Sequence, residues 1–126
     1  MPEKKASAST DPRMPVDLLE VDRQQDEMIR EIARRYADAL QKEFDLLGLY
    51  VYGSYAKGTQ RADSDIDIAV VADAFTGDDT VEDTWHLMKL RRGVDIRIEP
   101  HPFLPSDFTE ANPAALEVMR TGIRIV

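Results

Sequence analysis

The segment from Asp65 to Val70 alternates acidic or small residues with branched aliphatic residues, and this pattern constrains the fold more than any other. Successive side chains of a β-strand point to opposite faces of a sheet. Asp65 and Asp67 would therefore share one face, while the aliphatic side chains enter a core. A strand with a merely solvated polar face shows the same alternation. The pattern thus predicts a strand, and its chemistry depends on what surrounds the two carboxylates.

Other periodic segments predict the rest of a small α/β domain. Apolar residues recur every fourth position from Met28 to Phe44, which predicts one long helix over about residues 16–44. Composition and capping residues add strands over 49–52, 94–99 and 123–126 and helices over 80–93 and 113–122. The expected fold is a small mixed β-sheet packed with helices.

The two ends of this domain are predicted from composition. Residues 1–15 are rich in Ser, Ala, Lys, Thr and Pro, and too few of them are apolar to offset the entropy of ordering, so we expect a flexible tail. We expect residues 16–126 to form a single domain. Pro100 and Pro102 predict a loop after the strand over 94–99.

Charge and composition limit the partners. The formal net charge is -8, which disfavours strong non-specific binding of nucleic acid, because that binding needs Lys and Arg to neutralise phosphates. The chain has no cysteine, which excludes disulfides and thiolate metal sites and is compatible with a cytoplasmic location. No apolar run approaches the length of about 20 residues that spans a membrane.

A glycine turn precedes the acidic strand. Gly53 and Ser54 follow the predicted strand over 49–52 and precede a short predicted helix. Unpaired backbone N–H groups at the start of a helix bind phosphate, and glycine lets a bulky anion approach closely. A Gly-Ser pair is also common in ordinary turns, so by itself it is weak evidence.

The carboxylates indicate a divalent-metal site. Asp65 and Asp67 on one face would repel each other, and a divalent cation with oxygen ligands would remove that cost. Asp95 interrupts the apolar alternation of the strand predicted over 94–99. If that strand lies beside the first, three carboxylates converge and could hold two metal ions. Otherwise Asp95 would be an exposed residue paired with Arg97 or Arg124.

Together these residues resemble a known family. Gly53-Ser54, then Ser64-Asp65-Ile66-Asp67-Ile68, and a later Asp95 are similar to the signature of the DNA polymerase beta-like nucleotidyltransferase superfamily. The short chain most resembles the minimal nucleotidyltransferases, or MNT group. Lys57 stands where many members carry Arg, so a cation is kept but a bidentate phosphate contact would be lost.

The resemblance implies a reaction and a set of site residues. The chain would transfer a nucleoside monophosphate, such as AMP, from ATP or another NTP to an acceptor hydroxyl. Two Mg2+ ions would be the cofactor. Asp65, Asp67 and Asp95 would be the catalytic and metal-binding residues. The nucleotide side would be formed by Gly53, Ser54, Lys57 and Ser64.

The resemblance also implies partners, with alternatives left open. Minimal members resemble the antitoxin of a pair whose toxin is a HEPN-domain protein, and a tyrosine of that toxin would be the acceptor. Because 126 residues leave little room for an acceptor domain, we expect the acceptor surface from another protein or from a second copy in a homo-oligomer. The alternatives are an antitoxin that only binds and occludes its toxin, an antibiotic nucleotidyltransferase, and a metal-dependent phosphohydrolase.

Three further residues are predicted to lie outside the chemistry. His86 and His101 are isolated in the sequence, with no ligand spacing between them, and Trp85 has the pattern of a packing residue.

Overall fold

The computed structural model of the protein describes residues 16–53, 64–75 and 80–126. The tail predicted over residues 1–15 lies outside this part of the chain.

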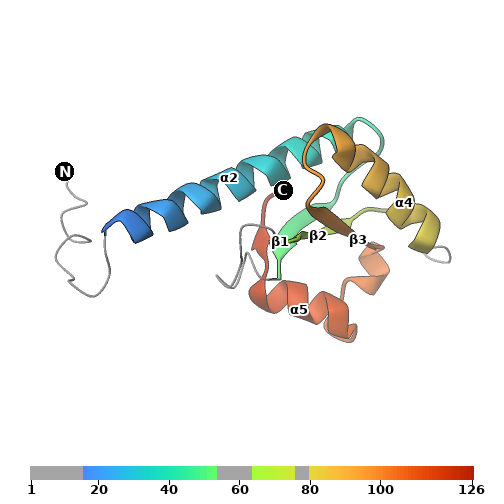
Figure 1. Ribbon diagram of the computed structural model, residues 1–126. Coiled ribbons are helices and arrows are strands. Elements are labelled where there is room, and N and C mark those ends of the chain that lie inside the picture. Colours follow the sequence, from blue (N-terminus) through green and yellow to red (C-terminus); the bar gives the residue numbers. More distant parts are fainter. Residues whose placement is uncertain (1–15, 54–63, 76–79) are drawn as a thin grey trace.

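A four-stranded mixed sheet lies at the centre of the fold (Figure 1). The strands are β1 (Gly48–Tyr52), β2 (Ile66–Val71), β3 (Ile98–Phe103) and β4 (Ile123–Arg124). They lie in the order β3-β2-β1-β4, with β2 parallel to β3 and β1 antiparallel to both β2 and β4. The expected α/β class with a small mixed sheet is confirmed.

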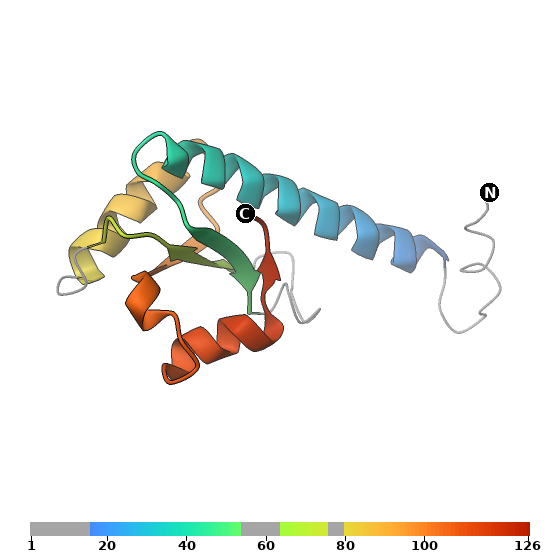
Figure 2. The same ribbon diagram turned by 180° about the vertical axis from the view of Figure 1, so that it is seen from behind.

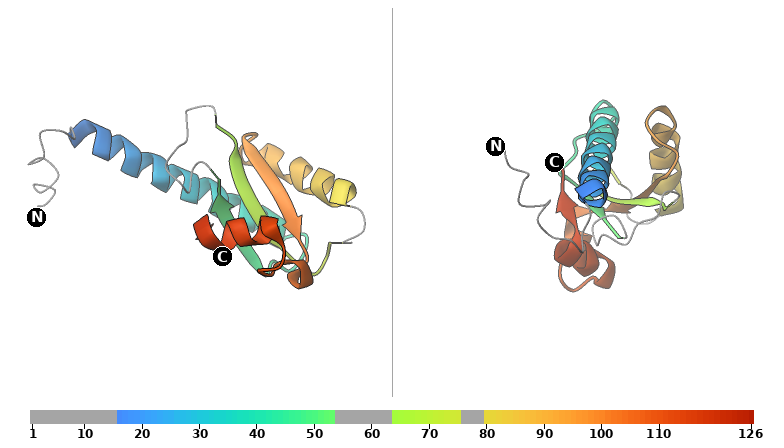
Figure 3. Two further views of the ribbon diagram at one scale, coloured as in Figure 1. Left: turned by 90° about the horizontal axis from the view of Figure 1, so that it is seen from below. Right: turned by 60° about the vertical axis from the view of Figure 1, so that its left-hand side comes forward.

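In the part of the chain that the structure describes, three α-helices cover the two faces of the sheet. They are α2 (Val16–Gln41), α4 (Thr80–Leu90) and α5 (Pro113–Thr121), and two short 3₁₀ helices, η1 (Arg91–Gly93) and η2 (Pro105–Asp107), follow α4 and β3. Helices α2 and α4 lie on one face and α5 lies on the other (Figure 3). Helix α4 connects the parallel strands β2 and β3, as such a crossover requires.

Each face of β2 contributes to a different core. Ile66, Ile68 and Val70 are buried against α2 and α4, together with Tyr36 and Leu40 of α2. On the other face the smaller cluster consists of Ala69, Val71, Phe103, Ala115 and Val118. The alternation in the sequence therefore produces two apolar layers, and the polar residues at the start of β2 lie on the face of α5.

Helix α2 carries the apolar stripe that the sequence predicts, except that it ends at Gln41, before Phe44, and that Met28 is not buried. Ile32, Tyr36 and Leu40 are buried, whereas Met28 is 52% exposed. The N-terminal part of α2 extends past the sheet (Figure 2). Ile29, next to Met28, is buried in the core, because a strict four-residue repeat drifts off the buried face of a helix with about 3.6 residues per turn. The Tyr36 hydroxyl donates a 2.7 Å hydrogen bond to the carbonyl oxygen of Leu87, which joins α2 to α4. None of the helices in the described ranges has the length and apolarity needed to cross a membrane.

Strand β3 differs from the prediction. A strand was expected over 94–99 and a proline loop after it, whereas β3 runs through both Pro100 and Pro102. Among the described strands it lies at the edge and pairs with β2 only. The carbonyl oxygens of Arg97 and Phe103 accept hydrogen bonds from the N–H groups of Ile66 and Ala72. Pro100 and Pro102 alternate with the residues that bond to β2. Their backbone nitrogens face the open edge of the sheet, where no N–H donor is needed.

Helix α5 begins and ends at the capping residues that the sequence predicts. The side chain of Asn112 accepts a 3.0 Å hydrogen bond from the backbone N–H of Ala114, and Pro113 occupies the first turn of α5. The N–H of Gly122 closes the helix on the carbonyl oxygen of Val118. The chain then enters β4, which pairs with β1 as the predicted final edge strand.

Candidate functional site

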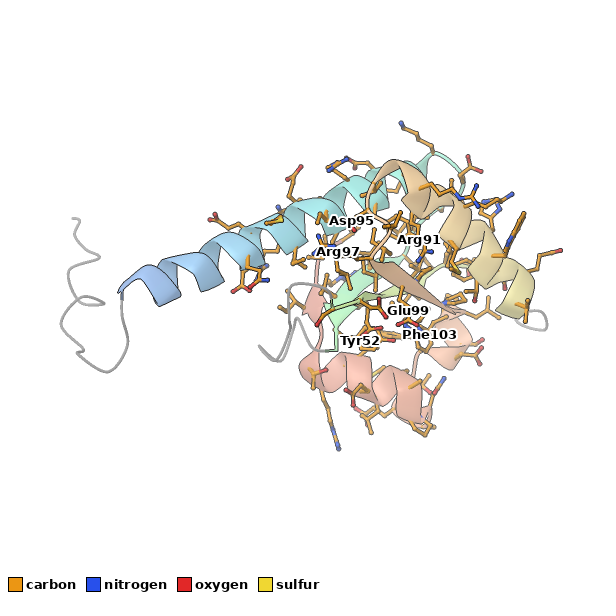
Figure 4. The ribbon with its side chains drawn as sticks, viewed as in Figure 1. Tyr52, Arg91, Asp95, Arg97, Glu99 and Phe103 are labelled. Carbon is orange, nitrogen blue, oxygen red and sulfur yellow. The ribbon has the colours of Figure 1, made fainter. Side chains whose placement is uncertain are left out.

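A row of polar side chains crosses three strands at one edge of the sheet. Asp67 of β2 pairs in register with Tyr52 of β1 on one side and with Glu99 of β3 on the other. Paired residues in neighbouring strands point to the same face. Figure 4 shows Tyr52 and Glu99 close together on the side of the sheet that faces α5.

His101 joins this row from β3. Its Nε2 lies 3.2 Å from Oδ1 of Asp67 and 4.0 Å from Oε1 of Glu99. The imidazole ring also packs edge-on against the ring of Tyr52, with the ring centres 5.5 Å apart. One ligand atom each from Asp67, Glu99 and His101 lie within 4.8 Å of one another. We call these three residues the acidic–histidine cluster.

The two carboxylates of the cluster have opposite shifts in pKa. The hydrogen bond from His101 holds the pKa of Asp67 below its ordinary value, against the effect of burial. The hydrogen bond with Asp67 raises the pKa of Glu99, and burial and the charge of Asp67 raise it further. Glu99 therefore loses its proton at a higher pH than Asp67 does, because the two carboxylates repel each other. A cation held between the two would remove the repulsion.

Gly53 brings the glycine turn against the cluster. Its φ is 76°, a conformation that other residues rarely adopt. A Cβ atom at this position would collide with the carboxylate of Asp67. Glycine at position 53 therefore makes room for Asp67, which is a second reason for this residue besides the close approach of an anion that the sequence predicts.

The other residues predicted for this site are placed as follows. Asp65 is exposed, lies directly before β2, and contributes to the raised pKa of Glu99 through its charge. Ser64 is half-buried beside it. Ser54 and Lys57 lie outside the described residues. The structure thus brings Gly53, Asp65 and Asp67 to one edge of the sheet.

The prediction that Asp95 lies in a strand beside Asp67 is wrong. Asp95 lies in the turn before β3, where its carboxylate accepts hydrogen bonds from the Arg97 guanidinium at 3.1 and 2.9 Å and from the Arg97 backbone N–H at 2.8 Å. These bonds, with the more distant charge of Arg35 on α2, lower the pKa of Asp95. Figure 4 shows Asp95 and Arg97 towards α2, away from Glu99. Glu99 occupies the position opposite Asp67 that Asp95 was expected to fill.

The sequence contained a signal for Glu99 and His101. The two residues alternate with Ile98, Pro100 and Pro102, with the same period of two that marks Asp65 and Asp67. Pro100 and Pro102 hide that alternation in the sequence, because proline is typical of loops. The prediction that His101 is isolated is therefore wrong, because its partner Asp67 lies 34 positions away in sequence and beside it in the sheet.

A depression of about 270 Å³ opens beside the cluster. Its walls come from Asp65, Glu99 and His101 on the sheet and from Thr84, Met88 and Arg91 on the helical side. Thr84 and Met88 also border a second, mostly apolar depression of about 310 Å³ with Val81 and Trp85. The two depressions therefore share part of α4 as a common wall.

A larger hollow lies elsewhere and is a poor match for a triphosphate. It measures about 500 Å³, and its walls include Phe44 and Phe75, whose rings pack edge-on, and the carboxylates of Glu43, Glu82 and Asp83. These three negative charges would repel phosphates. His86 lies here, with Nε2 3.6 Å from Oε1 of Glu43.

The donor set of the acidic–histidine cluster fits a divalent cation. Ligand atoms at adjacent positions of an octahedral ion with bonds of about 2.1 Å lie about 3.0 Å apart. The 3.2 Å between Asp67 Oδ1 and His101 Nε2 is close to that spacing, and the 4.0 Å between His101 and Glu99 requires a small inward movement of the half-exposed Glu99 side chain. The paired carboxylates supply the negative charge that such an ion requires.

A mixed sheet with helices on both faces, and carboxylates gathered at one edge beside a glycine turn, defines the class of nucleotidyltransferase domains. The family model described as "Polymerase beta, Nucleotidyltransferase" matches residues 35–125, and the chain belongs to this family.

Comparisons with individual proteins agree with this assignment. A curated relative named "Putative protein adenylyltransferase MJ1215", from Methanocaldococcus jannaschii, is 40% identical over 42 residues, which are 33% of this chain and 49% of that protein. The chain thus matches about half the length of that relative. A crystal structure of a toxin-antitoxin with AMP-PNP superposes with a TM-score of 0.53 at 23% identity, covering 75% of this chain and 72% of the other. A toxin-antitoxin MntA-HpeT mutant has a TM-score of 0.50 at 22% identity, with the same coverages. At these identities the two structures show the similarity of fold.

Proposed function

We propose that this protein transfers AMP from ATP to a hydroxyl group of a partner protein, with divalent cations of the Mg2+ type. The observation that carries the proposal is the meeting of Asp67 and Glu99 in register, directly beside the turn at Gly53. The name of the archaeal relative, a protein adenylyltransferase, and the AMP-PNP in a protein of the same fold favour ATP as the donor.

Each residue of the site has a part in this reaction. The acceptor oxygen would form a bond to the α-phosphorus of ATP while the bond from that phosphorus to the leaving pyrophosphate breaks. Asp65, Asp67 and Glu99 would hold the cations, which neutralise negative charge on the triphosphate. We assign the proton of the attacking hydroxyl to the carboxylate of Glu99, which lies opposite Asp67 in the sheet. We assign the phosphates to the turn at Gly53, with Ser54, Lys57 and Ser64 as candidate contacts.

The outer side of α4 supports a protein as the acceptor. Val81 is 79% exposed and Trp85 is 58% exposed, and with Met88 they form an apolar surface. Met88 also lines the depression beside Glu99 and His101. The nitrogen of Lys89 lies 4.2 Å from the centre of the Trp85 ring, which steadies the indole in an exposed position. Exposed aromatic residues are typical anchors of protein interfaces. We propose that the partner segment with the acceptor hydroxyl crosses this surface.

The partner is proposed to be the toxin of a toxin–antitoxin pair, of the HEPN type. The two similar solved structures are toxin-antitoxin proteins, which supports the pairing at the level of fold. A second copy of this chain is the other acceptor to be tested.

The test is transfer of label from ATP labelled at the α-phosphorus, with the protein alone and with the product of the adjacent gene. Label on the partner supports the proposal, and label on this chain alone indicates the second copy. Asp67→Asn should abolish transfer, because it removes a charged cation ligand while keeping the shape of the side chain. Asp73→Asn, an exposed carboxylate beyond the end of β2, is the matched control and should transfer normally. Tight binding of the partner without any label would mean that the protein occludes its partner and does not modify it. Normal transfer by Asp67→Asn would refute the proposed cation site.

The acceptor surface has its own test. Trp85→Ala should reduce label transfer to the partner at least about tenfold, as expected for the loss of an aromatic anchor. Binding of an ATP analogue should not change, since Trp85 is not among the residues that line the depression beside the cluster. Equal transfer by the variant and the unmodified protein would exclude this part of α4 from the acceptor interface.

A further inference from the structure

His101 is held in a fixed place within the acidic–histidine cluster. It lies in β3, two residues after Glu99, and its Nε2 is 3.2 Å from Oδ1 of Asp67. The edge-on contact with the ring of Tyr52 restricts rotation of the imidazole. Its side chain is 37% exposed, so a bound ion could reach the nitrogen without displacing the core.

His101 differs chemically from the other two members of the cluster. Asp67 and Glu99 offer carboxylate oxygens, the donors that Mg2+ prefers. An imidazole nitrogen is a softer donor that suits first-row transition cations, and their affinity for such a donor rises from Mn2+ to Co2+ and beyond. A site for Mg2+ alone would not need a nitrogen ligand beside the two carboxylates.

We propose that Nε2 of His101 is a metal ligand and that it gives this site a preference for a first-row transition cation, such as Mn2+ or Co2+, over Mg2+. The inference rests on the proposed function, because it assigns a further ligand to the cation of that same site. The alternative role of His101 is to donate a hydrogen bond that only orients Asp67. The two roles differ in their effect on different cations: a ligand favours some cations over others, whereas a residue that orients Asp67 affects all of them alike.

The test is calorimetric titration of the full chain with Mn2+, Co2+ and Mg2+ separately. The unmodified protein should bind Co2+ more tightly than Mn2+, and Mn2+ at least about tenfold more tightly than Mg2+. His101→Gln keeps an N–H group that can donate to Asp67 but removes the imidazole ligand. It should weaken binding of Mn2+ and Co2+ at least about tenfold and binding of Mg2+ by less than about twofold.

The chain offers a matched control in its other histidine. His86 contacts Glu43 and lies in the larger hollow, apart from the cluster. His86→Gln should leave the affinities for all three cations unchanged. Equal losses for Mg2+ and Mn2+ in His101→Gln would show that His101 only positions Asp67, and unchanged affinities would show that it does neither; both results overturn the inference.

A second measurement needs no variant. Pulsed electron paramagnetic resonance of Mn2+ bound to the unmodified protein should show coupling to a histidine nitrogen, and its absence would also overturn the inference. These outcomes are separable from failure of the proposed function. If Asp67→Asn abolishes label transfer and no nitrogen coupling is seen, the transfer site stands without His101 as a ligand. If Asp67→Asn transfers normally, the transfer site itself is wrong.

Discussion

Gly53→Ala tests the contact between the glycine turn and the acidic strand. The φ of 76° at Gly53 costs alanine about 1 kcal/mol, and the new Cβ atom would collide with the carboxylate of Asp67. To avoid it, Asp67 must give up the hydrogen bond that it accepts from His101, which costs about 1.5–3 kcal/mol for a bond to a charged group. We therefore expect the free energy of unfolding to fall by about 2.5–4 kcal/mol.

The assay is urea denaturation at neutral pH, with Gly93→Ala as the matched control. No atom lies within 4 Å of a Cβ at Gly93 and its φ is not positive, so that substitution should be neutral or slightly stabilising. In a background of Asp67→Ala the cost of Gly53→Ala should fall to the backbone part, about 1 kcal/mol, because the colliding carboxylate is gone. Equal stability of Gly53→Ala and Gly93→Ala would refute the reasoning, and so would an unchanged cost in the Asp67→Ala background.

Three further predictions follow from single contacts. Glu99→Gln should stabilise the metal-free protein at pH 7 by about 0.5 kcal/mol, a value reduced for solvent screening, because Glu99 has a raised pKa and its ionised form is disfavoured in the fold. This gain in stability should vanish in urea denaturation below pH 4.5, the ordinary pKa of the residue. A loss of stability at pH 7 would contradict the repulsion between Glu99 and Asp67. Asp95→Asn should cost less than about 1 kcal/mol at pH 7, since the lowered pKa of Asp95 means that its ion pair stabilises the fold above pH 3.8. The two proteins should converge as the pH falls through that lowered pKa, and a difference that persists in acid would rule out the ion pair as its cause. Asn112→Ala should lower stability by about 1 kcal/mol through loss of the α5 cap, measured by thermal unfolding, without changing cation affinity. A change in affinity would mean that α5 influences the cluster.

Residues whose neighbours lie close in sequence were predicted well. The alternation from Ile66 to Val71 specifies a strand with two distinct faces, and the repeat that includes Ile32, Tyr36 and Leu40 specifies the helix packed against it. The cap at Asn112 is local as well. In each case the information lies within a few positions, so the pattern alone determines the element.

The third carboxylate could not be chosen in the same way. Asp95 and Glu99 both follow α4, and only the register of β3 against β2 places Glu99 opposite Asp67. That register depends on where the edge strand begins, and Pro100 and Pro102 obscured it because proline is tolerated on an open edge. Met28 shows a different limit, since a strict four-residue repeat drifts off the buried face of a helix, and Ile29 is buried in place of Met28.

The central claim is that Glu99, and not Asp95, completes the cation site with Asp67. The most direct measurement is the affinity of Mn2+ for the unmodified protein, Glu99→Gln and Asp95→Asn, followed by the electron paramagnetic resonance signal of free Mn2+. We expect Glu99→Gln to lose at least about tenfold in affinity and Asp95→Asn to bind as the unmodified protein does. Normal binding by Glu99→Gln together with weakened binding by Asp95→Asn would contradict the account.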